Sequence, residues 1–384
     1  MSISGELSIT LSRPNSQLDC QINSTRPMQA SNIFTGKSIT QTLTTLPLLF
    51  NICSKAQSVT AVRAIESAKQ ISANSYTEST REALITLESL REQSLRVAMD
   101  WPAYINEQVD NKLLSHIALG INQLMQTLDT KMALAYQAHD QKHTSNQNHH
   151  WENFSKVLSH TLFGISADKW LESVHQDQQL EEWTRKQHTQ IARVIHWLNH
   201  KEWKNAGKSS ITHIPDINDD ELLDLLVQKE QRFTAQPSWN NQCYELSWFS
   251  RQQKARKPSD GTKNNGLYAR MVARPIEIAN LIVRLDTFFI HNKAIEATKS
   301  TAIGMAHSDA ARGRLTHYVE VENETIEKLL ILAPTEWNFH PKGVAAESLN
   351  NLDAENERDL HQQANLLVHS IDPCVAYQLT VEKI

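Results

Sequence analysis

Four cysteines are the residues of this chain best suited to chemistry: Cys20, Cys53, Cys243 and Cys374. A thiolate is a nucleophile and a soft metal ligand. The four cysteines are too widely spaced for a disulfide framework, so we expect free thiols. Cys53 stands just before a helical pattern, and Cys374 follows Pro373, which restricts the backbone on both sides of its nitrogen. We therefore expect any special cysteine here to be a metal ligand or a nucleophile.

The other polar clusters have simpler interpretations. Cys20 and Cys243 lie in strand-like segments without ligand neighbours, and we interpret them as packing residues. Several histidines recur at helical spacing or side by side: His139 and His143, His196 and His200, His149 and His150. No carboxylate or cysteine accompanies them at the spacing of a metal site, so this pattern favours a solvated helix face. Phosphate-binding glycine loops, nucleophile elbows and His-Glu-x-x-His motifs are absent from the sequence.

The elements that must position the cysteines are mostly helical. The chain has only 10 glycines in 384 residues, so tight turns are scarce. Apolar residues recur at helical spacing in residues 56–71, 78–99, 104–138, 151–203, 219–233, 268–291 and 355–370. Alternating segments predict two hairpins, 6–12 with 17–23 and 315–321 with 325–332. We predict a mainly α (α+β) fold with small β hairpins near both termini.

The chain is long enough for a large core, since 40% of its 384 residues are hydrophobic. We expect one domain over residues 1–384. Within it we expect a β-rich N-terminal segment at 1–50, a helical core at 51–250, a flexible loop at 251–266, and at 267–384 a helix, a hairpin and the C-terminal Asp-Pro-Cys segment.

Charge and hydropathy exclude several classes of partner. The net charge is -5 and the basic residues are spread along the chain, so we expect no nucleic-acid partner. Residues 1–13 lack the pattern of a secretion signal. The longest apolar stretches, near 46–53 and 329–334, are too short to span a membrane. We therefore expect a cytoplasmic protein without a membrane partner.

Three separated stretches resemble, in the same order, motifs of the nickel–iron hydrogenase large subunit. Residues 51–56, Asn-Ile-Cys-Ser-Lys-Ala, are similar to the family's Cys-x-x-Cys opening into an alanine-rich helix. Residues 311–317 and 333–341 resemble its Arg-Gly hairpin and Thr-Trp-Asn loop. Residues 370–374, Ser-Ile-Asp-Pro-Cys, resemble the start of its closing Asp-Pro-Cys-x-x-Cys-x-x-His. The resemblance implies a large-subunit-like helical core, although residues 100–265 contribute almost nothing to it.

The departures from these motifs concern the metal ligands. In the family four thiolates hold nickel and iron, and here the two bridging positions read Ala56 and Tyr377. The resemblance thus implies Cys53 and Cys374 as the remaining metal ligands. An aliphatic carbon cannot ligate, and a neutral phenol with a pKa near 10 is a poor substitute for a bridging thiolate. We therefore expect no stable two-metal centre and no hydrogen turnover.

Positions that the family uses for proton transfer and processing also differ. The glutamate of the N-terminal motif corresponds to Ser4, and the histidine beyond the first cysteine pair corresponds to Thr60. The C-terminal histidine corresponds to Thr380, with only residues 381–384 following it. A protein that relays protons needs titrating groups at such positions. We therefore expect no catalytic residues and no C-terminal peptide to be removed.

Other features of the family's site are kept. Arg312 matches the arginine above the metals, whose donors suit bound cyanide, and Asp372 matches the carboxylate that helps to fix that arginine. Both would support the cofactor without ligating it, although Arg312 is equally well explained as a structural arginine paired with a carboxylate. The start of a helix after Cys53 favours a thiolate there, because a helix N-terminus supplies a positive dipole and free amides.

This combination resembles the HupK/HoxV family of hydrogenase accessory proteins. The resemblance implies a non-catalytic scaffold that transiently holds iron with carbon monoxide and cyanide ligands, and no nickel. It also implies HypC/HypD-like maturation proteins and the hydrogenase large-subunit precursor as partners. Two alternatives remain: a metal-free interaction module for the same partners, and an enzyme, either a residual hydrogenase or a relative of the respiratory quinone-site subunit. The Asp-Pro-Cys ending at Cys374 argues against the last.

Overall fold

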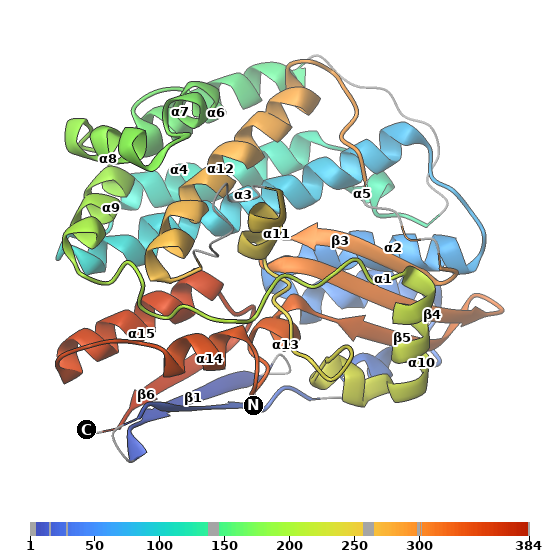
Figure 1. Cartoon of the computed structure of the whole chain (residues 1–384). Helices are drawn as coiled ribbons and strands as arrows, with labels where there is room; N and C mark the ends of the chain where they lie inside the picture. Colours follow the sequence, from blue (N-terminus) through green and yellow to red (C-terminus); the bar gives the residue numbers. More distant parts are fainter. Residues whose placement is uncertain are drawn as a thin grey trace.

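Helices form a broad layer on one side of the molecule, and two small sheets lie on the other (Figure 1). The computed structural model describes residues 5–14, 17–27, 30–136, 146–255, 265–297, 300 and 302–382. The predicted mainly α fold with small β hairpins is confirmed. No helix in these residues has the length and apolar character needed to cross a membrane.

The helical layer is built around α3 (Ser75–Tyr104) and α12 (Leu267–Phe289), which pack against each other. Around them lie α4 (Asn111–Thr127), α5 (Thr130–Ala133), α6 (Asn146–Phe163), α7 (Ala167–Ser173), α8 (Asp177–Lys186) and α9 (Gln190–His200). In α4 the buried residues Leu113, Ile117, Ile121 and Leu124 recur at helical spacing, so one face enters the core. The same periodicity explains why the sequence predicted this layer.

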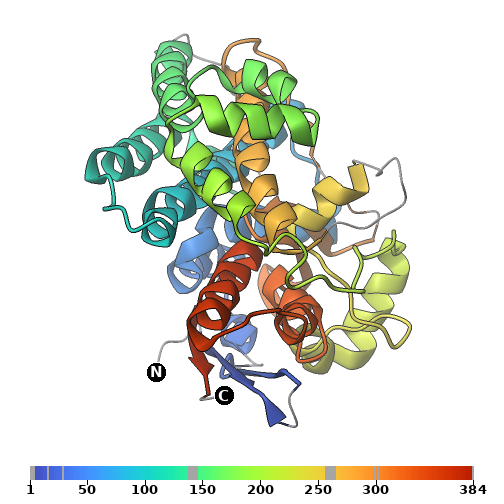
Figure 2. The same ribbon diagram turned by 60° about the vertical axis from the view of Figure 1, so that its left-hand side comes forward.

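The first sheet joins the two ends of the described chain. Strand β1 (Glu6–Ser12) pairs antiparallel with β2 (Asp19–Ser24), as predicted, and parallel with β6 (Ala376–Val381), which the sequence analysis missed. In β1, Leu7, Ile9 and Leu11 are buried, and the alternating residues are more exposed. The first and last strands consequently lie side by side in both views (Figures 1 and 2).

The second sheet has the strand order β3 (Met305–Ala310), β4 (Gly313–Glu322), β5 (Thr325–Leu332). The β4–β5 hairpin was predicted, whereas β3 was not. Helix α2 (Ser54–Ala68) packs on β3 and β4, and α1 (Ile39–Leu49) packs beside α2. The short 3-10 helices η2 (Ala30–Phe34) and η3 (Asn51–Cys53) precede α1 and α2 respectively. The second sheet therefore lies directly against the helix that follows Cys53.

Buried ion pairs fix α2 against α3. Nη1 of Arg81 lies 2.7 Å from Oε2 of Glu66, and Nη2 of Arg63 lies 2.9 Å from Oε1 of Glu82. All four side chains are almost completely shielded from solvent. Removing one partner of such a pair typically costs about 3–5 kcal/mol, because the other charge stays buried alone. These pairs hold the C-terminal part of α2 in place relative to α3.

The remaining helices connect the two sheets to the helical layer. They are α10 (Asp219–Ala235), α11 (Trp248–Ala255), α13 (Pro334–Asn338), α14 (Val344–Asn350) and α15 (Glu357–Ile371). Helix α15 packs against α12 and α14, and it ends directly before the Asp-Pro-Cys segment. Figure 2 shows α15 running from beneath the helical layer toward the first sheet.

Three predicted boundaries were wrong. The helix predicted over 104–138 is broken, because α3 ends at Tyr104 and Asp110 caps the separate helix α4 through its side chain. The segment at 1–50 contains α1 as well as strands. The loop predicted at 251–266 begins as helix α11, and residues 256–264 lie outside the described residues. In each case the hydrophobic pattern alone did not reveal the capping or packing that decides a boundary.

Candidate metal centre

Cys53 ends the 3-10 helix η3 and is the N-cap residue of α2. Its side chain is half-buried and makes no capping hydrogen bond to the backbone of α2. Nε2 of Gln57, one turn along α2, lies 3.8 Å from Sγ of Cys53 and donates to it. Local structure thus presents the thiol beside the helix N-terminus, as the sequence predicted.

The amide groups at this N-terminus are already used by a carboxylate from α3. Oε1 of Glu88 accepts from the backbone N–H of Lys55 at 2.8 Å, and Oε2 accepts from that of Ala56 at 3.0 Å. Burial raises the pKa of Glu88 to about 7, although these backbone donors oppose the rise. Glu88 therefore caps α2 in the place that the sequence analysis had left to a thiolate.

The expectation of a favoured thiolate at Cys53 was wrong for the metal-free chain. Burial raises its pKa to about 12, and the negative charges of Cys374 and Glu88 add to the rise. Arg312 and the hydrogen bond from Gln57 act in the opposite direction but do not compensate. Desolvation disfavours an anion, and here it outweighs the helix N-terminus. Without a cation, Cys53 is a neutral thiol.

Cys374 is positioned by the end of α15 and by α13. The helix stops at Asp372, whose φ of 67° is left-handed, and Pro373 then turns the chain toward β6. The backbone N–H of Cys374 donates to Oγ1 of Thr335 at 3.1 Å, and that hydroxyl donates to Sγ of Cys374 at 3.0 Å. A single threonine thus holds both the backbone and the sulfur of Cys374.

The two sulfurs lie in one electrostatic environment, although they come from opposite ends of the chain. The charge of Cys374 raises the pKa of Cys53. Both sulfurs also raise the pKa of Arg312, against the opposing effect of burial. Such interactions weaken with distance, so Cys53 and Cys374 lie within electrostatic range of each other and of Arg312.

Arg312 occupies the turn between β3 and β4, and its side chain is almost completely buried. Nη1 donates to Oε2 of Glu92 at 3.1 Å, whereas buried Nε has no hydrogen-bond partner among the described residues. Gly313 makes this turn possible: its φ is 133°, and a Cβ there would overlap the carbonyl oxygen of Leu246. Nε of Arg312 instead lies 3.5 Å from Oδ2 of Asp372, so a buried ion pair compensates its charge there.

Asp372 lies among three arginines. Its carboxylate is 3.0 Å from Nε of Arg96, 3.7 Å from Nη1 of Arg274 and 3.5 Å from Nε of Arg312. Burial alone would raise the pKa of Asp372, but the three guanidiniums lower it below its ordinary value. The carboxylate therefore remains charged and holds Arg312 from one side, so the pairing expected from the sequence is present.

Arg26, at the end of β2, was missed by the sequence analysis. Its Nη1 lies 2.6 Å from Oε1 of Glu336 and 3.8 Å from Sγ of Cys374. Burial opposes its charge, yet Cys374 and Glu336 together raise the pKa of Arg26 above its ordinary value. Residues 26 and 374 are 348 positions apart. No local pattern in the sequence signals this contact.

The two bridging positions hold the residues that the sequence predicted to be unable to bridge metals. Ala56 is fully buried, and Tyr377 lies in β6, in register with Leu7 of β1. Burial raises the pKa of Tyr377 to about 12, so its phenol is neutral and even harder to ionise than an ordinary tyrosine. Neither side chain supplies a thiolate.

The other predicted positions fall outside this centre. Cys20 is buried in the main core, in agreement with a packing role, and half-buried Cys243 has its Sγ 3.3 Å from Nδ1 of His340. Thr60 is buried and donates to the carbonyl of Ala56, and Thr380 is exposed on β6. His196 and His200 share a face of α9, and both lie at its surface. The predictions for Ser4, His139 and His143 lie outside the described residues.

Within the described ranges, no group of three or more His, Cys, Asp or Glu side chains is arranged as a metal site. The donor set at this place consists of the sulfurs of Cys53 and Cys374, with the buried guanidinium of Arg312 within electrostatic range of both. A bare divalent ion requires more protein ligands than this. A metal that brings most of its own ligands fits the donor set better.

Comparisons with known proteins point to the same family. Residues 243–379 match the nickel-dependent hydrogenase family. The hydrogenase expression/formation protein HoxV of Cupriavidus necator is 26% identical over 377 residues, covering 93% of this chain and 91% of HoxV. HupK of Bradyrhizobium diazoefficiens is 32% identical over 170 residues, covering 42% of this chain and 45% of HupK. This chain is a homologue of the HoxV and HupK proteins.

Solved structures place the fold of this HoxV homologue among hydrogenase large subunits. A variant of the NiFeSe hydrogenase of Desulfovibrio vulgaris Hildenborough superposes with a TM-score of 0.56 at 12% identity, covering 97% of this chain and 99% of that chain. An NAD⁺-reducing NiFe hydrogenase superposes with a TM-score of 0.58 at 12% identity, covering 93% and 92%. The resemblance inferred from three short motifs therefore extends over nearly the whole fold.

Proposed function

We propose that this chain acts in the maturation of nickel–iron hydrogenase as a non-catalytic scaffold. In this role Cys53 and Cys374 transiently hold iron that carries carbon monoxide and two cyanides while the active site of the large subunit is assembled. The observation that supports the proposal is the electrostatic interaction of Cys53 and Cys374 with each other and with buried Arg312. The names of its homologues, hydrogenase expression/formation proteins, agree with such a role.

The number of sulfur ligands suits an iron that brings its own ligands. Carbon monoxide and two cyanides fill three coordination positions of the iron. Two thiolates then fill most of the positions that remain. Soft thiolate ligands suit such an iron, whereas the oxygen-rich sites of magnesium or calcium need a different donor set. Each thiol must lose its proton when the iron binds, as metal binding to cysteine generally requires. The iron is thus cargo that enters and leaves.

Arg312 and Asp372 would orient the cargo without ligating it. A cyanide nitrogen accepts hydrogen bonds, and the planar guanidinium of Arg312 has five N–H donors. Asp372 holds the guanidinium through an ion pair of 3.5 Å at Nε, and Glu92 accepts from Nη1. A planar guanidinium fixed in this way presents its donors in one direction. Such outer contacts commonly tune metal affinity and ligand orientation.

The same site argues against hydrogen turnover. A two-metal centre requires thiolates that bridge the metals, and the corresponding positions hold Ala56 and a neutral Tyr377. Two sulfur ligands also bind less tightly than four, which permits release. We infer that the scaffold receives its iron from HypC/HypD-like maturation proteins and passes it to the large-subunit precursor in the cytoplasm.

Infrared spectroscopy of protein purified from cells with the hydrogenase maturation genes tests the proposal. Bound carbon monoxide and cyanide absorb in a region free of protein bands, so we expect both sets of bands together with iron by metal analysis. The bands should disappear in Cys53→Ser and Cys374→Ser variants and remain in Cys243→Ser, the matched control outside the centre. Absence of the bands from the wild-type protein, or their persistence in both serine variants, would overturn the ligand assignment.

A second function, a metal-free interaction module for the same partners, is favoured by one surface feature. Leu48 and Ile52, just before Cys53, are 75% and 37% exposed, so this segment presents two large apolar side chains to solvent. Under this alternative, maturation of the hydrogenase survives the Cys53→Ser/Cys374→Ser double variant and fails in Leu48→Ser/Ile52→Ser. The scaffold function predicts that the double cysteine variant abolishes maturation.

A further inference from the structure

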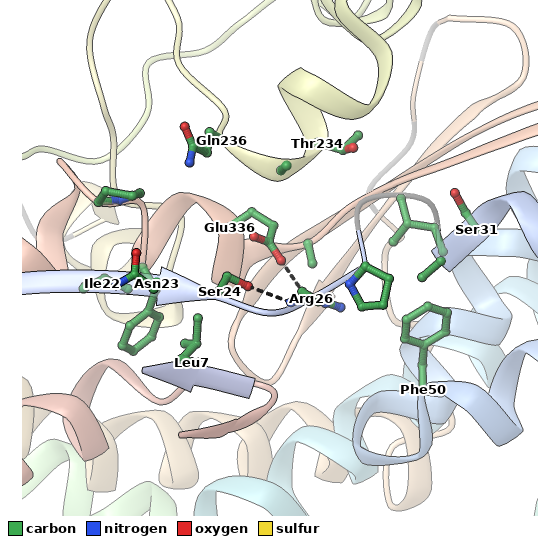
Figure 3. A pocket seen from close by; sticks show the side chains of 17 residues that line it. Leu7, Ile22, Asn23, Ser24, Arg26, Ser31, Phe50, Thr234, Gln236 and Glu336 are labelled. Atoms are coloured by element: carbon green, nitrogen blue, oxygen red, sulfur yellow. Dashed lines mark hydrogen bonds and ion pairs between the residues drawn. The ribbon is translucent and has the colours of Figure 1, made fainter. Parts of the chain in front are cut away.

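A pocket opens at the surface between the first sheet, α10 and α13, close to the candidate metal centre. It encloses about 270 Å³, and Figure 3 shows Arg26 and Glu336 facing each other in it. The backbone of Arg26 is held by a hydrogen bond from its N–H to Oγ of Ser24 at 3.2 Å. With about 30 Å³ for each water molecule, the pocket holds about nine waters. It is therefore large enough for a small ligand and too small for a folded partner.

The walls of this pocket belong to the segments that carry the two cysteines. Phe50, in its wall, directly precedes the 3-10 helix that ends at Cys53. Glu336, also in the wall, directly follows Thr335, whose hydroxyl donates to Sγ of Cys374. The pocket thus lies between the segment that precedes Cys53 and the helix α13, whose Thr335 holds Cys374.

Arg26 is the link between the pocket and the sulfur. The same atom, Nη1, contacts Oε1 of Glu336 at 2.6 Å and Sγ of Cys374 at 3.8 Å. The side chains of Arg26 and Glu336 are only 15% and 13% exposed, so their charges act through a weakly screening medium. A guanidinium has five N–H donors in a planar fork, and it can hold Glu336 while it binds a second acceptor.

We propose that this pocket is an access site for small anions and cyanide-bearing iron, in which Arg26 receives the negative end of the ligand and Glu336 competes for Arg26. The inference rests on the scaffold function proposed above for the identity of the cargo. Before a ligand enters, Glu336 neutralises Arg26 and keeps the buried guanidinium from being unpaired. A ligand with negatively charged nitrogen or oxygen atoms takes up the donors of Arg26 and is thereby held next to Cys374.

Competition by Glu336 gives the pocket selectivity. A neutral molecule gains nothing from the guanidinium, because the existing ion pair is a stronger contact. An anion can accept from the N–H donors of Arg26 that Glu336 does not use, and such charge-assisted hydrogen bonds are about twice as strong as neutral ones. Removing Arg26 should therefore slow the reaction of anions at Cys374 more than that of neutral molecules. Removing the charge of Glu336 should selectively speed the reaction of anions.

Alkylation of Cys374 by two reagents of similar size tests this inference without iron. Iodoacetate is an anion and iodoacetamide is neutral, and both react with the same thiolate. The ratio of their rates at Cys374, measured by peptide mass spectrometry, cancels any change in the thiolate fraction. We expect the ratio to fall about 10-fold in Arg26→Gln, to stay near the wild-type value in Arg26→Lys, and to rise in Glu336→Gln.

The matched control is Arg193→Gln, which removes the same charge from an exposed ion pair with Glu107. It should leave the ratio at Cys374 within about twofold of the wild type, because surface charges farther than a Debye length are screened. An unchanged ratio in Arg26→Gln overturns the inference. If Arg26→Gln fails to fold by circular dichroism, Glu336→Gln decides: a ratio that does not rise also overturns it.

The outcome is independent of the test of the scaffold function. Missing carbon monoxide and cyanide bands would refute the cargo while leaving an anion-selective route to Cys374 in place. Conversely, infrared bands that depend on both cysteines, together with an unchanged alkylation ratio, would support the scaffold and remove the role of Arg26.

Discussion

The carboxylate of Asp372 lies 3.5 Å from Nε of Arg312, and both side chains are almost completely shielded from solvent. One residue ends α15, and the other forms the turn between β3 and β4. Their contact joins the C-terminal segment, which carries Cys374, to the second sheet, which packs on the helix after Cys53. The relative position of the two cysteines therefore depends on this ion pair.

Replacing Asp372 with Asn should destabilise the protein strongly. The substitution preserves shape but leaves Arg96, Arg274 and Arg312 without the carboxylate that they share. A buried charge that loses its partner typically costs about 3–5 kcal/mol, which urea unfolding can measure. Glu107→Gln, in the exposed pair with Arg193, should cost at most about 1 kcal/mol. A similarly small loss in the free energy of unfolding for Asp372→Asn would show that the three arginines do not need the carboxylate of Asp372.

Replacing Gly313 with Ala should displace Arg312 and abolish any infrared bands. A Cβ at this position would overlap the carbonyl oxygen of Leu246, so the turn must move. Gly36→Ala is the matched control: its φ of 79° is also left-handed, but nothing lies within 4 Å of the added Cβ. The control should lose only about 1–2 kcal/mol for the backbone conformation, and Gly313→Ala clearly more. Equal losses of stability in the two variants would contradict the steric explanation.

His317 should make the protein sensitive to mild acid. It is fully buried, and its Nε2 lies 2.9 Å from Oε1 of Gln57. Burial lowers the pKa of His317 to about 3, so between the ordinary histidine pKa of about 6.5 and that value the unfolded chain binds a proton that the folded chain does not. The free energy of unfolding should therefore fall with falling pH in this window, by about 1.4 kcal/mol per pH unit from this residue.

The variant His317→Gln removes this contribution. Urea unfolding at about pH 6, 5 and 4 should give a shallower dependence on pH in the variant than in the wild type, whatever the offset in stability between them. Identical slopes would mean that His317 is protonated in the folded protein or is accessible to water.

Restoring the two bridging thiolates should make the site bind its metal more tightly and release it more slowly. In Ala56→Cys/Tyr377→Cys, four sulfurs become available, and metal loss to a chelator should slow by at least about tenfold, which corresponds to about 1.4 kcal/mol. Ala61→Cys/Tyr377→Phe is the control, because Ala61 is a buried residue of the same helix in a different apolar cluster. Metal analysis over time measures the retention. Equal rates of metal loss from the two variants would show that the new thiols do not bind the metal.

The sequence by itself determined the elements and the chemistry of the ligands. Alternation in β1 and the helical period of α4 are local properties, because a side chain's direction follows from its own backbone conformation. The short motifs around Cys53, Arg312 and Cys374 identified the relevant family. The resemblance also implies that Ala56 and Tyr377 stand at the positions of bridging thiolates, because a change of residue type is visible without coordinates.

Only the tertiary structure decided how these groups act on one another. Glu88 caps the helix after Cys53, Arg26 reaches Cys374 across 348 positions, and β6 pairs with β1 at the other end of the chain. Such contacts join residues that no local pattern links, and burial then sets their charges. The expected thiolate at Cys53 failed for this reason: desolvation and neighbouring anions outweighed the helix N-terminus, and both depend on what folds around the sulfur.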